Sequence, residues 1–310
     1  MPSDHGVVRR KVKTMVVVRI MGGLGNQLFE YAAGRRLAMV NNNSLKLDVS
    51  NYETSPRPYR LDRFSIVEDI ASDSEVKRLT GRSSRNTMPA RIGRRLSRYA
   101  QRFQSSQKTS VIKECSTGFH PEVLSAAGDA YLDGYWQSEL YFKDIEDVIR
   151  KELTLKDTPD SVNRGAGTAI SECESISLHV RRGDYVSNPL FNEVHGICPL
   201  DYYHAAIKLL VEKVENPHFF VFSDDLEWTK ENLKLDYPAA YMDHNGEEKD
   251  YEDLHLMSLC KHHIIANSSF SWWGAWLCSN PNKVVIAPKK WFNDQAKDSD
   301  DIVPSSWRRI

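Results

Sequence analysis

Short apolar runs rich in β-branched residues constrain the fold of this chain more than any other feature of its sequence. They cover residues 14–20, 175–180, 218–223, 262–266 and 283–288. Each run is almost continuously apolar and does not alternate with polar residues, which is typical of strands buried on both faces of a parallel sheet.

Helical patterns lie between these runs. In residues 27–40, 200–215 and 250–260, apolar side chains recur at intervals of three and four residues. Strands that alternate with helices of this length form βαβ units, so the sequence predicts an α/β fold with parallel sheets. Because 310 residues are many for a single core, we expect two domains.

Two unusual stretches guide the domain boundaries. Residues 156–174, with Asp-Thr-Pro-Asp and Arg-Gly-Ala-Gly, are the predicted linker between an N-terminal domain over 1–155 and a C-terminal domain over 175–310. Residues 82–113 hold nine Lys or Arg and no acid. Such an insertion is either a solvated excursion with a helix packed on the body or a membrane-surface patch. The spacing of its few apolar residues favours the excursion.

Bulk properties exclude several classes of protein. The 41 Lys and Arg nearly cancel the 42 Asp and Glu, so the net charge of −1 gives no reason to expect nucleic-acid binding. No apolar run approaches the roughly 20 residues of a membrane span. The five cysteines form no CxxC pair, which favours reduced thiols in a cytoplasmic protein. Peripheral contact with the inner face of the membrane, through 82–113, stays open.

A glycine-rich loop follows the first predicted strand and opens a helix. Gly22, Gly23 and Gly25 precede Asn26 and Gln27. Glycines permit positive φ and close approach of a ligand, and the helix start offers free N–H groups to an anion. The spacing is neither the dinucleotide fingerprint nor a P-loop. The sequence therefore predicts a loop that faces a ligand of another kind.

Two adjacent arginines follow the second strand. Arg181 and Arg182 stand in His179-Val-Arg-Arg-Gly-Asp-Tyr, at a strand end where ligands of open α/β sheets gather. Guanidinium groups suit a diphosphate because of their fixed donor geometry. A structural ion pair with Asp184 is the alternative for one of them, and both roles can hold together.

Polar clusters also follow the next two strands. Asp224 and Asp225 come after Ser223. They could bind a metal, cap a helix or accept hydrogen bonds from a nucleobase, and a helix cap by one acid is favoured. The segment Ser268-Ser269-Phe270-Ser271 opens another helix, and its three serine hydroxyls could form a phosphate cradle, with a simple N-cap as the alternative role for one serine. The D-x-D spacing of metal-dependent sugar transferases occurs only at Asp298-Ser-Asp, in a polar tail, so no metal site is predicted.

These motifs resemble those of the bacterial α-1,2-fucosyltransferases of glycosyltransferase family 11. The resemblance runs from about residue 16 to 291 and is most specific at HVRRGDY, residues 179–185. Four further segments reinforce it: GGLGNQLFEYAAGRRLA at 22–38, LDGYWQSELYF at 132–142, CPLDYYHAAI at 198–207 and NSSFSWWGAWL at 267–277.

The resemblance implies a GT-B architecture, in which two Rossmann-like domains with parallel sheets face a central cleft and the C-terminal domain holds GDP-fucose. It also implies inversion at the anomeric carbon, no required metal or other cofactor, and transfer to the 2-hydroxyl of a galactose-terminated glycan such as an O-antigen unit.

The resemblance also implies roles for particular residues. Arg181 should bind the β-phosphate of the leaving GDP. His179 and an acid of residues 223–225 should contact the guanine-ribose end, and the serines at 269 and 271 the diphosphate. The loop 22–27 should reach the fucose from across the cleft.

The general base is not determined by the sequence. Asp184 is the first candidate for the base, followed by His195 and Glu193. An equally favoured role for Asp184 is an ion pair that holds Arg182 in place. Three other functions also remain open. These are a fucosyltransferase for peptide or chitooligosaccharide acceptors, a nicotinamide-dependent oxidoreductase, which the failed glycine fingerprint disfavours, and a non-catalytic nucleotide-sugar-binding protein.

Overall fold

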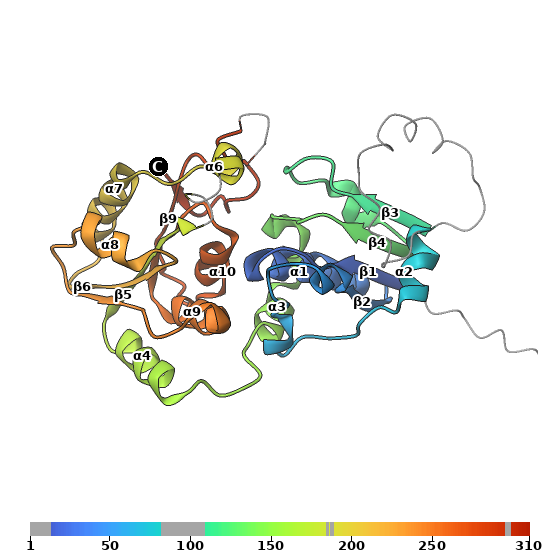
Figure 1. The fold of residues 1–310 in the computed structure, drawn as a ribbon, viewed down its shortest axis with the longest axis horizontal. Coiled ribbons are helices and arrows are strands. Elements are labelled where there is room, and N and C mark those ends of the chain that lie inside the picture. Colours follow the sequence, from blue (N-terminus) through green and yellow to red (C-terminus); the bar gives the residue numbers. More distant parts are fainter. Residues whose placement is uncertain (1–13, 82–108, 184–185, 187–188, 295–298) are drawn as a thin grey trace, which may run out of the picture.

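The computed structural model describes residues 14–81, 109–183, 186, 189–294 and 299–310. These residues form two parallel sheets, each surrounded by helices (Figure 1). The predicted α/β class is therefore confirmed, and each of the five apolar runs forms a strand.

The first sheet has the strand order β2-β1-β4-β3. Its strands are all parallel and comprise β1 Met15–Arg19, β2 Ser44–Asp48, β3 Thr109–Lys113 and β4 Asp129–Asp133. The accompanying helices are α1 Leu24–Val40, α2 Asp73–Thr80 and α3 Glu146–Glu152. The centre of β1, Val16 to Val18, is completely buried, as its unbroken apolar character predicts.

The second sheet has the order β10-β9-β8-β5-β6-β7, also all parallel. Its strands are β5 Glu174–Val180, β6 Pro217–Ser223, β7 Ala239–Tyr241, β8 His262–Ile264, β9 Val285–Ala287 and β10 Arg308–Arg309. Its helices are α4 Ser161–Ser171, α6 Pro189–His195, α7 Leu200–Val211, α8 Leu226–Asn232, α9 Asp250–Leu259 and α10 Ser269–Leu277.

The strand order of the second sheet creates a topological switch point. From β5 the chain proceeds outward to β6 and β7, then returns to β8 on the other side of β5 and continues to β9 and β10. Loops at the carboxyl ends of β5 and β8 therefore diverge, which leaves a crevice where ligands of such sheets bind. The first sheet has the same feature between β1 and β4.

A shared aromatic core joins the two sheets. Helices α1 and α10 lie side by side between them (Figure 1). Phe29 of α1 lies with its ring centroid 4.4 Å from that of Trp272 and 5.0 Å from that of Trp273. Phe142, also from the first unit, stacks on Trp273 at 5.4 Å. The side chains of Phe29, Phe142, Trp272 and Trp273 are all completely buried, so the two units are packed as one body.

The predicted linker differs from a plain connection. Residues 161–171 form α4, which packs against α9. Asp160 caps this helix by accepting from the backbone N–H groups of Val162 and Asn163. The glycines of this segment favoured a loop in the sequence. Packing explains one of them, because a Cβ on Gly167 would lie only 3.2 Å from Leu259 Cδ1.

The basic insertion differs at its carboxyl end. Residues 109–113 form β3, which pairs with β4 along its whole length, so they belong to the first sheet and not to an excursion. The β-branched residues Val111 and Ile112 favour a strand there. The helix expected around residues 92–103 lies outside the described residues. Within the part of the chain that is described, no helix is both long and apolar enough to cross a bilayer.

Candidate active site

The arginine, aspartate and serine motifs come together at the carboxyl edge of the second sheet. Arg181 follows β5, Asp224 follows β6, and the 267–271 segment follows β8. Since β5 pairs with both β6 and β8, with Val180 opposite Ser223, the three strand ends are neighbours. The predicted gathering of the motifs at one edge is therefore present in the structure.

The two arginines pair with the two aspartates. Arg181 Nη1 lies 3.1 Å from Asp224 Oδ2, and Arg182 Nε lies 3.1 Å from Asp225 Oδ2. Asp224 also accepts the backbone N–H of Arg182 at 2.8 Å. Gly183 permits this arrangement, because a Cβ there would lie 2.3 Å from Asp224 Oδ2. The arginine and aspartate motifs thus form one cluster.

Arg182 is the more firmly held of the two arginines. Its guanidinium carbon lies 3.4 Å from the centroid of the Trp228 ring, in a cation–π contact. Asp225 is the N-cap of α8 and accepts from the backbone of Trp228, which confirms the predicted helix cap. Ser223 accepts from the Asp225 N–H and from Thr229 Oγ1. Arg182, Asp225 and Ser223 therefore support the edge on which Arg181 stands.

Asp184, the predicted partner and leading base, lies outside the described residues. Among the described residues, the two arginines form ion pairs with the two aspartates that follow β6. The adjacency of β5 and β6 decides this pairing, and sequence spacing does not reveal it.

His179 is a neutral, buried ring beneath the arginines. Burial, assisted by the charge of Arg181, lowers the pKa of His179 to about 3. The ring therefore carries one donor and one acceptor nitrogen near neutral pH. Its Nδ1 has no hydrogen-bond partner among the described residues, and its centroid lies 5.8 Å from that of the Phe270 ring. An orphan nitrogen of this kind fits a site that a ligand completes.

The start of α10 carries the serine motif. Ser268 caps the helix by accepting from the Phe270 N–H. Ser269 donates across to Asn26 Oδ1 at 2.8 Å. Ser271 is buried and donates to the carbonyl of Ser268, so it faces into the helix. Of the three serines predicted to form a cradle, Ser269 is the one whose hydroxyl is bonded across the junction of the two units, while Ser268 takes the alternative role of N-cap.

The glycine-rich loop meets α10 directly. A Cβ on Gly25 would lie 2.5 Å from Phe270 N and 2.5 Å from the Ser269 carbonyl carbon. Gly22 has φ +76° and Gly23 is the N-cap of α1. Asn26 Oδ1 also accepts from Gln137 Nε2 at 2.7 Å, directly after β4. The switch points of the two sheets are therefore joined by hydrogen bonds through Asn26.

Gln27 supports the loop from within. Its side chain is completely buried and donates to the carbonyls of Gly22 and Pro58, while its Oε1 accepts the Arg60 N–H. The contribution of this side chain is to hold the 58–60 turn against the glycine loop.

His195 lies beside the same edge. It ends α6, and its ring centroid lies 5.6 Å from that of Phe292. Asn267 Nδ2 donates to the carbonyls of His195, Gly196 and Trp291, which ties this segment to the end of β8. Glu193 is exposed.

Three residues with notable contacts or a large pKa shift had no role assigned from sequence. Gln137 lies in the 132–142 segment, but its side chain is not ionisable, so nothing in the sequence singled it out. Trp228 was indistinguishable from a packing aromatic. Asp253 belongs to an acidic first turn of α9, a pattern common at helix starts. Burial raises the pKa of Asp253 to about 7, against the hydrogen bond from Asn245 and with help from neighbouring acids.

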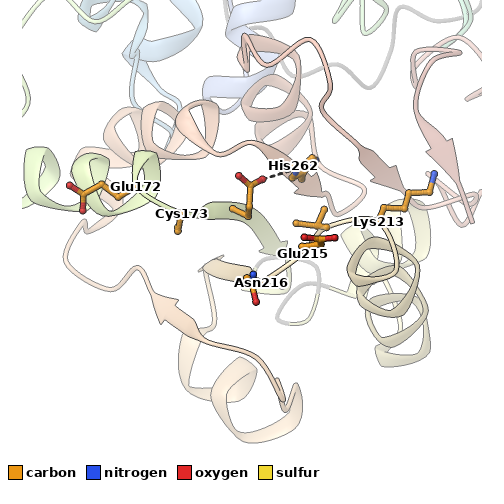
Figure 2. A pocket seen from close by; sticks show the side chains of 8 residues that line it. Glu172, Cys173, Lys213, Glu215, Asn216 and His262 are labelled. Carbon is orange, nitrogen blue, oxygen red and sulfur yellow. Dashed lines mark ion pairs between the residues drawn. The ribbon is translucent and has the colours of Figure 1, made fainter.

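A cavity of about 580 Å³ lies at the amino ends of the strands of the second sheet (Figure 2). Glu174 begins β5, His262 begins β8, and Asn216 precedes β6. The motifs stand at the opposite ends of these strands, so this cavity is not the predicted site.

Comparison with known proteins decides the family. The profile described as Glycosyl transferase family 11 matches residues 120–310. An alpha-1,2-colitosyltransferase of Escherichia coli is 37% identical to this chain, over 96% of this chain and 99% of the relative. The chain belongs to glycosyltransferase family 11. The O-antigen biosynthesis glycosyltransferase WbnK of Escherichia coli is 33% identical over 93% of this chain and 98% of its own length.

Solved structures agree on the architecture. NodZ alpha-1,6-fucosyltransferase soaked with GDP-fucose has a TM-score of 0.50 at 17% identity, over 87% of this chain and 97% of NodZ. A mutant of Arabidopsis thaliana FUT1 in complex with GDP also has a TM-score of 0.50, at 13% identity, over 88% of this chain and 70% of that chain. The fold of this family 11 glycosyltransferase is GT-B, as the motifs implied.

Among the residues that the structure describes, no group of three His, Cys, Asp or Glu side chains lies close enough together to hold a metal ion. Asp298 of the D-x-D sequence lies outside the described residues, and Asp300 lies 3.4 Å from Arg309.

Proposed function

We propose that this glycosyltransferase moves L-fucose from GDP-fucose to the 2-hydroxyl of a galactose-terminated glycan, with inversion at the anomeric carbon. One observation carries the proposal. Arg181 stands at the switch point of a GT-B sheet, held by Asp224 at 3.1 Å. A guanidinium in this place can meet the diphosphate of a nucleotide sugar.

The proposed reaction is a single displacement. The acceptor oxygen forms a bond to the anomeric carbon while the bond from that carbon to the phosphate oxygen breaks, and GDP leaves with the electron pair. The acceptor hydroxyl gives its proton to a base. Positioning of the two substrates and stabilisation of the charge on GDP supply most of the rate. The second task falls to Arg181, with Ser269 and the N-terminus of α10 beside it.

Colitose is the second candidate for the transferred sugar. The relative that is 37% identical to this chain is called an alpha-1,2-colitosyltransferase. Colitose is fucose without its 3-hydroxyl, so the two donors present the same diphosphate and nearly the same sugar. The name of WbnK, O-antigen biosynthesis glycosyltransferase, favours an O-unit glycan as acceptor and hence a cytoplasmic site of action.

The test is a donor and acceptor panel. Purified protein is incubated with GDP-fucose, GDP-colitose or GDP-mannose and with galactose-terminated, peptide or chitooligosaccharide acceptors, with and without EDTA. We expect transfer from GDP-fucose to galactose, unchanged by EDTA. Transfer from GDP-colitose alone would show that colitose, and not fucose, is the sugar transferred. If GDP-fucose binds but no acceptor causes release of GDP, the protein is a non-catalytic nucleotide-sugar-binding protein.

Asp184 stays the proposed general base. Asp184→Asn should abolish the acidic limb of the pH–rate profile of transfer and lower kcat by about a hundredfold or more, because proton removal is then uncatalysed. A variant whose pH–rate profile matches that of the unaltered enzyme would remove Asp184 from this role.

A further inference from the structure

A second cavity, of about 280 Å³, lies where the two units meet. One wall is the 52–60 segment, which follows β2 of the first sheet. The other is formed by Glu247 and Glu248, which lie between β7 of the second sheet and α9. Both walls follow the carboxyl ends of strands, as the arginine cluster does.

The cavity adjoins the glycine-rich loop. Tyr52 lines it and donates its hydroxyl to the carbonyl of Gly22 at 2.9 Å. The same loop continues to Asn26, which accepts from Ser269 at the start of α10. The glycine-rich loop therefore contacts both a wall of the cavity and the start of α10.

The walls combine aromatic faces with carboxylates. The rings of Tyr52 and Tyr59 lie with centroids 5.8 Å apart and tilted by 58°. Exposed Arg57, Glu247 and Glu248 surround them. Aromatic faces pack against the C–H face of a sugar ring, and carboxylates accept from its hydroxyl groups. The charges of these two glutamates are balanced by Arg57 and Arg60 in the same lining, so the cavity has no excess of positive charge and fits a neutral sugar better than the diphosphate of GDP.

The cavity is held open by contacts behind it. The ring of Tyr59 is held by its contact with Tyr52, and its hydroxyl donates to Glu68 at 2.8 Å. Buried Arg60 lies 3.2 Å from Glu248 and 3.3 Å from Asp250, and it donates to the carbonyl of Glu247 at 3.1 Å. These bonds join the two walls, so the site is formed before a ligand arrives.

We propose that this cavity is the acceptor subsite, in which Tyr52 and Tyr59 pack against a neutral sugar ring of the glycan and Glu247 and Glu248 accept from its hydroxyls. The inference rests on the proposed function and deepens it, since it places the acceptor on the opposite side of the glycine-rich loop from GDP. The chemistry is the same for a free oligosaccharide and for a lipid-linked one.

The test compares three variants by binding and by kinetics. Tyr59→Ala removes a ring, Tyr59→Phe keeps the ring and loses the bond to Glu68, and Glu247→Gln changes an exposed carboxylate without touching the backbone carbonyl that Arg60 uses. Glu122→Gln, another exposed glutamate, is the matched control. Lactose and N-acetyllactosamine are titrated into the GDP-bound protein by saturation-transfer NMR, and KM values are measured for each substrate.

We expect Tyr59→Ala and Glu247→Gln to weaken lactose binding and raise the acceptor KM by about tenfold or more. Tyr59→Phe and Glu122→Gln should retain both values. GDP affinity and the KM for the nucleotide sugar should stay unchanged in all four variants. A defect in the GDP site can therefore be distinguished from a defect in the acceptor subsite.

Unchanged lactose binding in Tyr59→Ala and Glu247→Gln would overturn the inference. So would a rise in the donor KM without a change for the acceptor, because the cavity would then serve GDP or its sugar. Failure of both oligosaccharides to bind the unaltered protein would overturn it as well. Because the NMR titration needs no turnover, it decides the question even if none of the GDP-sugars is a donor.

Discussion

At the scale of single residues, the account depends on Arg181. Its partner Asp224 fixes the guanidinium at a sheet edge, while Arg182 is engaged by Asp225 and by the ring of Trp228. The two neighbouring arginines thus differ in environment, although they look alike in the sequence. We expect their substitutions to differ as well.

Arg181→Ala should keep the fold and lower transfer by about a hundredfold or more, because a charge-assisted contact to the leaving group is worth roughly 3 kcal/mol. Initial-rate measurements with saturating acceptor check this. Arg164→Ala, at an exposed arginine of α4, is the control and should retain full activity. Substantial activity in the Arg181 variant would refute the assigned role.

Glu30 is a second residue with a testable property. Its side chain is completely buried and accepts the Met21 N–H at 2.8 Å, while Oε1 has no partner among the described residues. Burial raises the pKa of Glu30 well above its usual value, against that hydrogen bond and the charge of Arg19. The folded protein therefore holds the Glu30 proton to a higher pH than the unfolded chain does.

Glu30→Gln should remove a pH dependence of stability. Above the unfolded pKa of about 4.3, the unfolded chain releases this proton and the folded protein does not, so the free energy of unfolding of the unaltered protein falls by about 1.4 kcal/mol per pH unit from this group. The loss ends when the pH reaches the raised pKa. Urea titrations at pH 5, 6 and 7 should show the Gln variant gaining on the parent protein, whereas parallel pH curves would contradict the buried, protonated state.

At the scale of elements, the contact between the starts of α1 and α10 is the central feature. Helix packing this close requires Gly25, since a Cβ would meet the backbone of Ser269 and Phe270 at 2.5 Å. Backbone atoms cannot rotate away as a side chain can. The glycine that the sequence marks as ligand-facing is therefore also a packing residue.

Gly25→Ala should push α1 away from α10, lower the free energy of unfolding by about 1–3 kcal/mol and reduce transfer. Gly165→Ala is the matched control, because this glycine lies inside α4 and a Cβ there meets nothing within 4 Å. That change should stabilise the protein by about 0.5–1 kcal/mol. Chemical denaturation measures both. Equal effects of the two substitutions would contradict the close contact between Gly25 and the backbone of Ser269 and Phe270.

The extent of sequence-based prediction is also clearest at this scale. The α/β class and the strands β1, β5, β6, β8 and β9 could be predicted, because an apolar run buried on both sides leaves little choice. Strands β2 and β7 are short or half-polar, and α4 carries two glycines, so their local signals resemble loops. The Asp225 cap was predictable from its position before a helical pattern.

Pairings between distant segments could not be predicted. Asn26 and Ser269 are separated by 243 positions in the chain, and only the docking of α1 on α10 brings them together. Likewise, the pairing of Arg181 with Asp224 depends on β5 and β6 being neighbours in the sheet. Motifs identified the family and the sheet edge, whereas strand order decided which residues pair.

At the scale of the whole molecule, the two GT-B units share an apolar core. Phe29 and Phe142 of the first unit pack on Trp272 and Trp273 of the second. Trp272 Nε1 also donates to the carbonyl of Ile302, whose neighbour Asp301 bonds to Ser138 and Phe119 of the first unit. Independent motion of domains is the usual expectation only where the interface is small or polar.

The two units should therefore unfold together. Tryptophan fluorescence and far-UV circular dichroism should give one coincident transition in urea, although two-domain proteins often show two. Phe142→Ala should lower the midpoint markedly, since loss of a buried phenylalanine costs about 3–5 kcal/mol. Two well-separated transitions in the unaltered protein would contradict a shared core.

The central claim is that the carboxyl edge after β5 receives the diphosphate of a GDP-sugar. A crystal structure with GDP bound tests it most directly. We predict the β-phosphate within hydrogen-bond distance of the Arg181 guanidinium, beside the start of α10, with the arginine–aspartate pairs intact. A diphosphate bound elsewhere, out of reach of Arg181 and Ser269, would contradict the account.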